Sequence, residues 1–421
     1  MTPEVKKRIE QIRQGIVPEG YKKTESGIIP NEWRVGQVSK CIEEYKFFSN
    51  DISHIPVYSS SRKGLVPQSD YYNQREAVET NLGYKVVPQG YVTYRHMSDD
   101  DVFHFNINKT GENVLVSSEY PVFTSSDNCD LSFLISVLNN TARFRYFCKM
   151  QKLGGTRTRL YLDNLKRYAL ALPPFDEQKK IAEILATQDK AIELQGRKIE
   201  ELKRFKKGCL EKMFPRKGQK VPEKRFPGFT DDWEQRKVGD ITIESTEYLT
   251  LDSGLPLFTS SRNGLLYQNE YRGNVTTNNK QTLFSVVPLG ACTYRHMSDD
   301  DVFHLNINTI EKGLVSREYP VFCGTPNHDI VFIVQHINSS KAFRAFCAEQ
   351  KMGGTRTRLY YKALCEFTMM VPSFAEQRRI SKFLLTIDHL ITLHQRKLEE
   401  MKRQKKALMQ LLLTGIVRVR L

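Results

Sequence analysis

Two stretches of the chain repeat apolar residues at spacings of three, four and seven, with charged residues between them. Such spacings are typical of an amphipathic helix whose apolar stripe forms a coiled-coil seam. Because a stripe exposed to water would not keep a helix folded, we expect the two helices to pair with each other, antiparallel. The stripe positions are Ile181, Leu185, Ile192, Ile199, Leu202, Cys209 and Met213, and Ile380, Leu384, Ile391, Leu398, Met401, Leu408 and Leu412.

Some positions of these seams are polar, among them Lys206 and Lys405. A polar residue buried in a seam costs stability but can fix the register of the two helices. A polar residue at the rim of the seam would have no such effect. The pattern leaves both interpretations open.

Before each long helix, the pattern changes to short β-rich runs broken by Gly, Pro, Asn and Ser, with short helical patterns between them. This mixture predicts compact α+β domains. A short helix over 3–14 begins at Pro3, and the basic, Pro- and Gly-rich stretch 214–228 is typical of a linker. The predicted division is an N-terminal helical segment 1–29, a first domain 30–175, a central helix 176–213, the linker, a second domain 229–374 and a C-terminal helix 375–421.

The same module occurs twice. The string TYRHMSDDDVFH at 93–104 recurs unchanged at 293–304, and GGTRTRLY at 154–161 recurs at 353–360. An offset of about 200 residues is too long for a solenoid repeat and indicates domain duplication. We therefore expect two tandem globular domains, each followed by a long helix. The two helices would form an antiparallel coiled-coil spacer with pseudo-two-fold symmetry.

The net charge of +15 favours a polyanionic partner, DNA or RNA before an acidic membrane surface, although a merely basic surface would give the same number. The eight cysteines form no C-x-x-C pair and no zinc-ligand spacing, which is typical of reduced cytosolic thiols. The N-terminal sequence lacks the apolar stretch of a signal peptide, and no run has the roughly eighteen apolar residues of a membrane span. These patterns predict a cytoplasmic protein without membrane contact.

The sequence contains no motif for catalysis or cofactor binding. A G-x-x-x-x-G-K-[ST] loop and a Gly-rich strand-to-helix turn are both missing, so we expect no cofactor. Residues 172–175, Leu-Pro-Pro-Phe, resemble the NPPF motif of adenine methyltransferases, but Leu172 has no polar atom to hold a flipped base. The three aspartates at 99–101 are more typical of a turn, or of arginine orientation, than of a metal site.

Four features occur together in this chain. They are the P-x-x-W string at 30–33, the helix starts PPFDEQ at 173–178 and PSFAEQ at 372–377, and LLLTGIVRV at 411–419. With the tandem modules, they make the whole chain resemble the specificity (S) subunit of Type I restriction–modification systems. The second helix start departs from this pattern at Ser373 and Ala375, which weakens a cap.

The resemblance implies a non-catalytic subunit with two target-recognition domains, each reading half of a bipartite site in double-stranded DNA. It also implies that the helices dock two methyltransferase (M) subunits for S-adenosylmethionine-dependent adenine-N6 methylation. Restriction (R) subunits would add ATP-driven translocation and cleavage. The implied docking positions on the helices are Ile181, Leu185, Ile192, Ile199, Leu202, Ile380, Leu384, Ile391, Leu398 and Met401.

Three polar segments, each present in both modules, are candidates for DNA contact, because arginine pairs with guanine edges while Ser, Thr and Lys hold phosphates. They are a Ser/Thr-Arg patch, a Tyr-Arg-His strand end and the Gly-Gly-Thr-Arg-Thr-Arg loop. Two alternatives are that Arg95 pairs with an aspartate of 99–101 and that the loop docks the domain onto its helix. The candidates are Ser60, Arg62, Tyr94, Arg95, His96, Thr156, Arg157, Thr158 and Arg159, and Ser260, Arg262, Tyr294, Arg295, His296, Thr355, Arg356, Thr357 and Arg358.

Identical strings on antiparallel helices predict half-sites that are inverted copies, and so a near-palindromic target. Residues 67–85 and 267–285 differ between the modules, and the half-sites would differ if these stretches touched bases. Two other functions stay open. A self-sufficient nuclease or methyltransferase would need a catalytic constellation, and a stand-alone DNA-binding regulator would need no methyltransferase partner.

Overall fold

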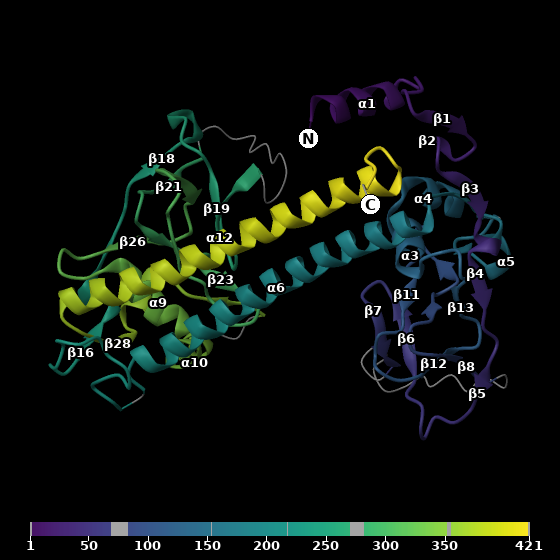
Figure 1. The fold of residues 1–421 in the computed structure, drawn as a ribbon. Coiled ribbons are helices and arrows are strands. Elements are labelled where there is room, and N and C mark those ends of the chain that lie inside the picture. Colours follow the sequence, from purple (N-terminus) through teal and green to yellow (C-terminus); the bar gives the residue numbers. More distant parts are fainter. Residues whose placement is uncertain are drawn as a thin grey trace. The chain divides into compact units, whose positions relative to one another are not determined.

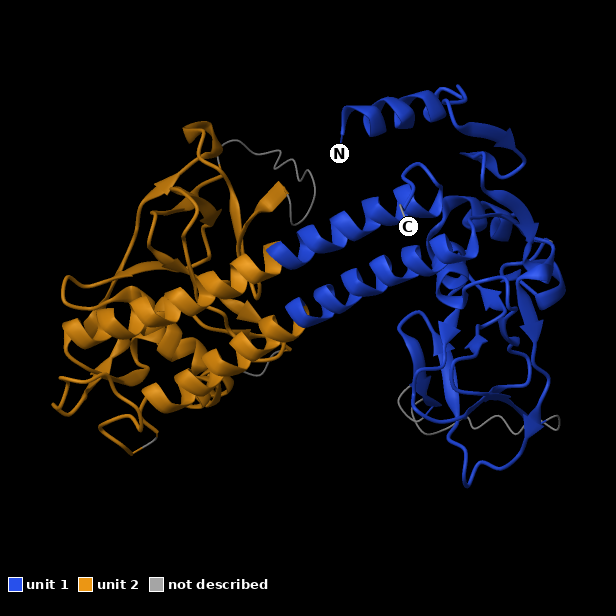
Figure 2. Cartoon of the chain, viewed as in Figure 1, with its two compact units in different colours: residues 1–195, 397–421 blue, residues 196–396 orange. Residues whose placement is uncertain are grey.

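The computed structural model describes residues 2–68, 83–152, 154–216, 218–269, 282–351 and 355–419. The chain divides into two compact units: residues 1–195 with 397–421, and residues 196–396 (Figure 2). Each long helix contributes one half to each unit. The compact units therefore have bounds different from those of the repeated sequence modules.

The first unit contains one module, the first half of the first long helix and the second half of the second one (Figure 1). Its elements are α1 (Pro3–Arg13), β1 (Tyr21–Thr24), β2 (Gly27–Pro30), β3 (Arg34–Gln37), β4 (Ile42–Glu44), β5 (Phe48–Ser49), β6 (Tyr58–Ser61), β7 (Gly64–Pro67), β8 (Tyr84–Val87), β9 (Val92–Thr93), β10 (Met97–Ser98), β11 (Asn106–Ile107), β12 (Val114–Ser117), β13 (Val122–Ser125), α3 (Leu131–Asn140), α4 (Ala142–Lys149), β14 (Thr158–Arg159), α5 (Leu162–Lys166), β15 (Ala169–Leu172) and the first half of α6 (Phe175–Met213).

The second unit includes the second half of α6 and then repeats this order from β3 onward. Its elements are β16 (Glu234–Lys237), α7 (Val238–Ile241), β17 (Thr242–Glu244), β18 (Tyr248–Leu249), β19 (Phe258–Ser261), β20 (Gly264–Tyr267), β21 (Phe284–Val287), β22 (Cys292–Thr293), β23 (Met297–Ser298), β24 (Asn306–Ile307), β25 (Gly313–Ser316), β26 (Val321–Gly324), α9 (Ile330–Ser339), α10 (Lys341–Glu349), β27 (Thr357–Arg358), α11 (Tyr361–Cys365), β28 (Thr368–Val371) and the first half of α12 (Phe374–Leu413). The helix predicted over 3–14 and the two long helices are confirmed, although the second long helix ends at Leu413 and does not continue through the predicted range 375–421.

The sheets of the two units have the same topology. The first unit has a four-stranded sheet of order β11-β9-β13-β4, and the second has β24-β22-β26-β17. Each unit also has a three-stranded sheet, β12-β8-β5 or β25-β21-β18, and the hairpin β6-β7 or β19-β20. Two-stranded sheets, β15-β3 and β10-β14 or β16-β28 and β23-β27, complete the shared topology. Short helices pack beside these antiparallel sheets. The predicted duplicated α+β architecture is confirmed.

The core of each unit joins the globular part to the long helices. In the first unit Trp33, which is fully buried, shares a cluster with Ile181 and Leu185 of α6 and with Leu412 of α12. In the second unit Trp233 shares the equivalent cluster with Met213, Ile380 and Leu384, among others. Burial of this apolar surface accounts for helix stability better than intrinsic propensity does.

The two long helices pair antiparallel within each unit. In the second unit Lys206 of α6 lies 2.8 Å from the carboxylate of Asp388 of α12. In the first unit Lys405 of α12 makes the same ion pair with Asp189 of α6. The two lysine side chains are only 20% and 19% exposed. The polar seam positions therefore pair across the interface, which favours the register-fixing interpretation.

A buried glutamate anchors the start of each long helix. Glu177, only 1% exposed, accepts from Trp33 Nε1 at 3.1 Å and from Arg418 Nε at 2.7 Å. At the start of the second helix, Glu376 accepts from Nε and Nη2 of Arg225, each at 2.7 Å. Arg225 belongs to the predicted linker. That segment is therefore tied to the start of α12 in the second unit.

The glutamine that follows each glutamate connects two helix starts. Gln178 donates to the carbonyl of Pro173 at 3.0 Å and accepts from the backbone N–H of Asp130 at 2.9 Å. Asp130 in turn caps α3. Gln377 makes the same two contacts with Pro372 and Asp329. The Glu-Gln pair of the helix-start motif is thus a structural clamp, and the second helix begins at Phe374 although it lacks the second proline.

Candidate DNA interface

Two of the predicted segments meet at the acidic turn that follows β10. Arg62, at the tip of the β6–β7 hairpin, forms an ion pair with Asp100. Arg157 donates its Nε to Asp99 at 2.8 Å. Thr158 donates its hydroxyl to Asp101. Segments about 60 residues apart in sequence therefore form one surface cluster.

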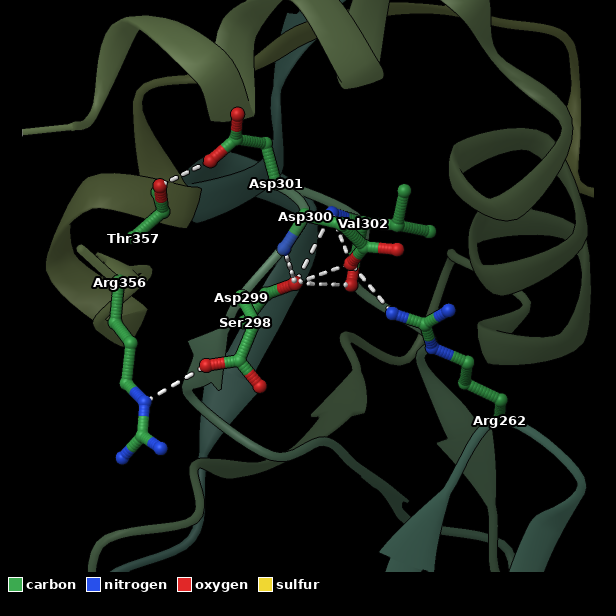
Figure 3. Close-up of polar contacts among 8 residues, drawn as sticks. All are labelled: Arg262, Ser298, Asp299, Asp300, Asp301, Val302, Arg356 and Thr357. Atoms are coloured by element: carbon green, nitrogen blue, oxygen red, sulfur yellow. Dashed lines mark hydrogen bonds and ion pairs between the residues drawn. The ribbon is translucent and has the colours of Figure 1, made fainter.

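The second unit builds the same cluster from the corresponding residues (Figure 3). Arg262 pairs with Asp300, Arg356 donates Nε to Asp299 at 2.7 Å, and Thr357 bonds to Asp301. Figure 3 shows the turn lying between the two arginines. The terminal nitrogens of Arg356 point away from it.

The backbone of this turn is unusual. Asp101 and Asp301 both have φ of 61°, and they are the non-glycine residues with positive φ in the described part of the chain. A left-handed conformation costs a non-glycine residue about 1–3 kcal/mol, and such strain tends to occur at functional sites. The hydroxyl of Ser98 holds the turn by accepting from the backbone N–H of Val102 at 3.1 Å.

The middle aspartate of the turn is held by hydrogen bonds that favour its charged form. Hydrogen bonds from Arg262 and Ser298 lower the pKa of Asp300 from its ordinary value. In the first unit Asp99 and Asp100 pair with Arg157 and Arg62, not with Arg95. The aspartates thus orient arginines, as one of the sequence interpretations held, but the arginines are different ones. Within the described residues, no group of three or more His, Cys, Asp or Glu is arranged to hold a metal ion.

A pocket of about 470 Å³ adjoins the turn in the first unit. Ser60, Arg62 and Lys63 line it from the hairpin, and Arg95 lines it from the strand end. Beside the turn, Thr156 and Arg159 are exposed, as are Thr355, Arg356 and Arg358 in the second unit. The Ser/Thr-Arg patch and the Tyr-Arg-His segment therefore share one concave, basic surface.

Tyr94 and His96 do not lie on that surface. Tyr94 is fully buried and its hydroxyl donates to the carbonyl of Leu160 at 3.0 Å, while His96 is 2% exposed. Tyr294 and His296 are buried likewise. Tyr94, His96 and Ser98 are the buried positions of an alternating run in which Arg95 is more exposed. The prediction that all three residues of this segment face DNA is therefore wrong for the tyrosines and histidines. The alternation of buried and exposed positions was not visible in the sequence, because the buried positions hold polar residues.

Two further predicted pairs are also buried. Ser60 and Ser260 are 5% and 4% exposed, and Thr158 and Thr357 are fully buried. The Ser60 hydroxyl accepts from Asn106 Nδ2 at 2.8 Å. These residues support the loops that carry Arg62 and Arg157 rather than presenting their own side chains.

An exposed aromatic ring in each unit was not among the predicted residues. Tyr161 and Tyr360 are 51% and 56% exposed and stack on the buried rings of His96 and His296, with centroids 5.4 and 5.5 Å apart. Burial lowers the pKa of both histidines, which favours neutral rings. The tyrosines end the repeated GGTRTRLY string, and this recurrence is the feature of the sequence from which they could have been predicted. Each follows an exposed arginine of the cluster by two residues.

Part of the predicted surface lies outside the described residues. This holds for Gly353 and Gly354, and for 69–82 and 270–281 within the two divergent stretches. Gly154 of the first loop is described and has φ of 68°, a conformation that glycine adopts without strain.

Comparison with known proteins identifies the family. The family model for the Type I restriction modification DNA specificity domain matches residues 35–204 and 316–403. The chain belongs to this family. It is therefore a specificity subunit, the non-catalytic DNA-recognition component of a type I restriction–modification system. This finding confirms the resemblance read from the sequence motifs.

Two related proteins align with most of the chain. A putative type I restriction enzyme MjaX specificity subunit of Methanocaldococcus jannaschii is 24% identical over an alignment of 437 positions, which covers 96% of this chain and 97% of that protein. The MjaVIII specificity subunit of the same organism is 24% identical over an alignment of 281 positions, which covers 61% of this chain and 63% of that protein.

Solved structures share the fold. The type I S subunit from M. genitalium aligns with a TM-score of 0.54 at 12% identity, over 92% of this chain and 97% of that one. A chain from a structural study of assembly and conformational transition in a type I R-M system aligns with a TM-score of 0.51 at 13% identity, over 92% and 99%. Among the described residues of the specificity subunit, no helix combines the length and apolarity that crossing a bilayer requires.

Proposed function

We propose that each acidic turn and its arginines face DNA, and that each unit reads one half of a bipartite target. The observation that carries this proposal is the convergence of two basic segments on one acidic turn, repeated with the same partners in both units. A net charge of +15 provides the sequence-independent attraction to phosphates.

The exposed arginines supply the base-reading chemistry. Arg159 and Arg358 are exposed and follow directly after the buried threonines of the cluster. Arg157 and Arg356 use only Nε for their aspartates, which leaves the terminal nitrogens free. A guanidinium with two free N–H groups on one edge can pair with O6 and N7 of guanine. The hydroxyl of Thr156 and the ring of Tyr161 would contact the backbone or a base face.

The two half-sites should be inverted copies. Every residue that lines the pocket in the first unit has an identical counterpart in the second, except Lys63, which is Asn263, and Val66, which is Leu266. Because α6 and α12 pair antiparallel, the two modules would read opposite strands. Identical readers on opposite strands specify a near-palindromic target.

The long helices would dock the M subunits, and the assembled M subunits would recruit R subunits. Of the ten expected docking positions, five are buried within this chain and five are half-buried. The buried ones are Ile181, Leu185, Ile199, Ile380 and Leu384, and the half-buried ones are Ile192, Leu202, Ile391, Leu398 and Met401. The apolar stripe thus offers a partner less accessible surface than the outer faces of the helices do. We assign docking to apolar residues on the outer faces of the helices, Leu194 of α6 and Leu385, Leu390 and Leu393 of α12, which are 39–53% exposed.

A genome-wide map of N6-methyladenine tests the proposal. The map is made in a host that expresses the chain with the methyltransferase encoded beside it, and in the same host without the chain. We expect one bipartite, near-palindromic motif to lose its methylation when the chain is removed. An unchanged map, with both proteins expressed, would instead favour a stand-alone DNA-binding regulator.

A further inference from the structure

Carboxylates in the middle of a DNA-binding surface require an explanation. Three consecutive aspartates lie between the arginines of each cluster, although carboxylates repel phosphates. The ion pairs contribute little to stability, because both partners are half exposed: Arg157 is 51% and Asp99 68% exposed, and Arg356 is 52% and Asp299 66%. Exposed pairs of this kind contribute only about 0–1 kcal/mol. Stability alone therefore does not account for the acidic turn.

The geometry of the pair at Asp99 points to a role in reading. Asp99 engages the inner nitrogen, Nε, of Arg157, and Asp299 does the same to Arg356. This contact fixes the plane of the guanidinium and leaves its outer edge unused, as Figure 3 shows for Arg356. The strained residue two positions later, Asp101, bonds to Thr158, the neighbour of Arg157. Two adjacent residues of the loop, Arg157 and Thr158, are therefore hydrogen-bonded to the turn.

We propose that Asp99 and Asp299 are specificity-determining positioning residues. Each holds its arginine in the one orientation that pairs with a guanine edge, and each offsets the attraction of that arginine for the phosphates of non-target DNA. A guanidinium released from its aspartate would swing freely and bind any phosphate within reach. This inference rests on the proposed function, since it requires that Arg157 and Arg356 face DNA.

The test is a double-mutant cycle on the full chain assembled with its methyltransferase. Affinity is measured for a duplex carrying the mapped target and for the same duplex with the half-site of the first unit scrambled, at several salt concentrations. The variants are Asp99→Asn, Arg157→Gln and the two combined. Asp127→Asn removes the same charge from an exposed residue of the same unit and serves as the matched control.

We expect Asp99→Asn to lower the ratio of target to scrambled affinity about tenfold, while the scrambled duplex binds as well or better. In the Arg157→Gln background the same substitution should leave the ratio unchanged, because the arginine it positions is gone. Asp127→Asn should leave the ratio at its original value. Asp299→Asn should repeat the effect when the other half-site is scrambled.

Asp99→Glu guards against a folding defect, since it keeps the charge and moves the carboxylate by one methylene. It should lower the ratio without raising affinity for the scrambled duplex. The inference is overturned if Asp99→Asn leaves the ratio unchanged, or lowers it equally with and without Arg157. If Arg157→Gln itself leaves target affinity unchanged, the proposed DNA interface is wrong as well. The result for Arg157→Gln therefore distinguishes a failure of the interface from a failure of the positioning role alone.

Discussion

Arg418 and Glu177 lie 241 residues apart in the sequence and form a bidentate ion pair, with Nε to Oε1 at 2.7 Å and Nη2 to Oε2 at 2.8 Å. The carboxylate is 1% exposed. Glu376 is fully buried and has the same arrangement with Arg225. In each unit, the segment that follows one long helix returns an arginine to the start of the other. An equivalent arginine–glutamate pair therefore connects the two long helices, through the segment that follows one of them, in both units.

Removing either arginine should destabilise one unit selectively. Arg418→Ala leaves a buried carboxylate without its cation, so we expect the free energy of unfolding of the first unit to fall by about 2–4 kcal/mol. Arg225→Ala should do the same to the second unit. Urea unfolding followed by hydrogen exchange assigns the loss to a unit. Arg403→Ala, which removes a 76% exposed arginine paired with Glu400, should cost less than about 0.5 kcal/mol. Equal losses for Arg418→Ala and Arg403→Ala would contradict this account.

The ion pair between Lys206 and Asp388 should respond to charge reversal. Lys206→Asp places two carboxylates together in a partly buried seam, and we expect it to destabilise the second unit by about 1–2 kcal/mol. Adding Asp388→Lys restores opposite charges and should recover most of that loss. Thermal unfolding of the two variants measures the coupling. The pair of Lys405 and Asp189 in the first unit is untouched and serves as the internal control; no recovery in the double variant would show that the pair is not coupled.

His336 should make the second unit sensitive to acid. Burial lowers the pKa of His336 from its ordinary value to about 4, and its ring stacks on Phe214 with centroids 4.6 Å apart. Since the folded pKa lies below the unfolded one, the unfolded state binds the proton between about pH 6.5 and 4. Stability is present above this window and is lost as the pH falls through it, by about 2–3 kcal/mol in total.

The repeat supplies the matched variant, because the corresponding residue of α3 is Val137. His336→Val should remove this part of the pH dependence while keeping the second unit folded. The measurement is the free energy of unfolding of the second unit from pH 7.5 to 4, for both proteins. Parallel pH profiles would exclude His336 as the source of the acid sensitivity, since the carboxylates titrate alike in both proteins.

The sequence predicted those parts of the fold that arise from local patterns. The stripe from Ile181 onward defined the long helices, and the repeated strings defined the duplication. The contact of Glu177 with Arg418 could not be predicted in this way, because its partner lies at the other end of the chain. Only the fold shows that a motif typical of a helix start is also an ion-pair site.

The candidate site was predicted in composition but not in orientation. The sequence placed Arg62, Arg95 and Arg157 at the surface, and the structure brings their segments together. The sequence could not show that Arg95 is more exposed than its neighbours Tyr94 and His96. Burial of a tyrosine or a histidine depends on partners distant in the sequence, such as the carbonyl of Leu160. Polar residues can occupy inward positions when such partners exist.

A charge on the outer face of α12 should block assembly. Leu390→Glu with Leu393→Glu alters two residues that are 39% and 45% exposed, so the chain should keep its melting temperature. We expect co-purification with the methyltransferase to fall about tenfold, as for an interface hot spot. Leu289→Glu makes the same chemical change at a 65% exposed loop residue and should have no effect. Normal assembly of the double variant would place docking elsewhere.

Arg157 and Arg356 should each govern one half of the methylated motif. Arg157→Ala is expected to relax the base preference of a single half-site, with a loss of about 1–3 kcal/mol of discrimination, and Arg356→Ala that of the other. Arg157→Lys distinguishes the two ways an arginine can contact DNA, because lysine holds a phosphate but cannot replace a bidentate pair. If Arg157 reads a base, the lysine variant relaxes the motif as far as alanine does. If the lysine variant keeps the motif while alanine weakens binding to all sequences, the arginine contacts phosphate instead. In vitro methylation of a duplex library randomised in one half-site at a time measures each outcome directly.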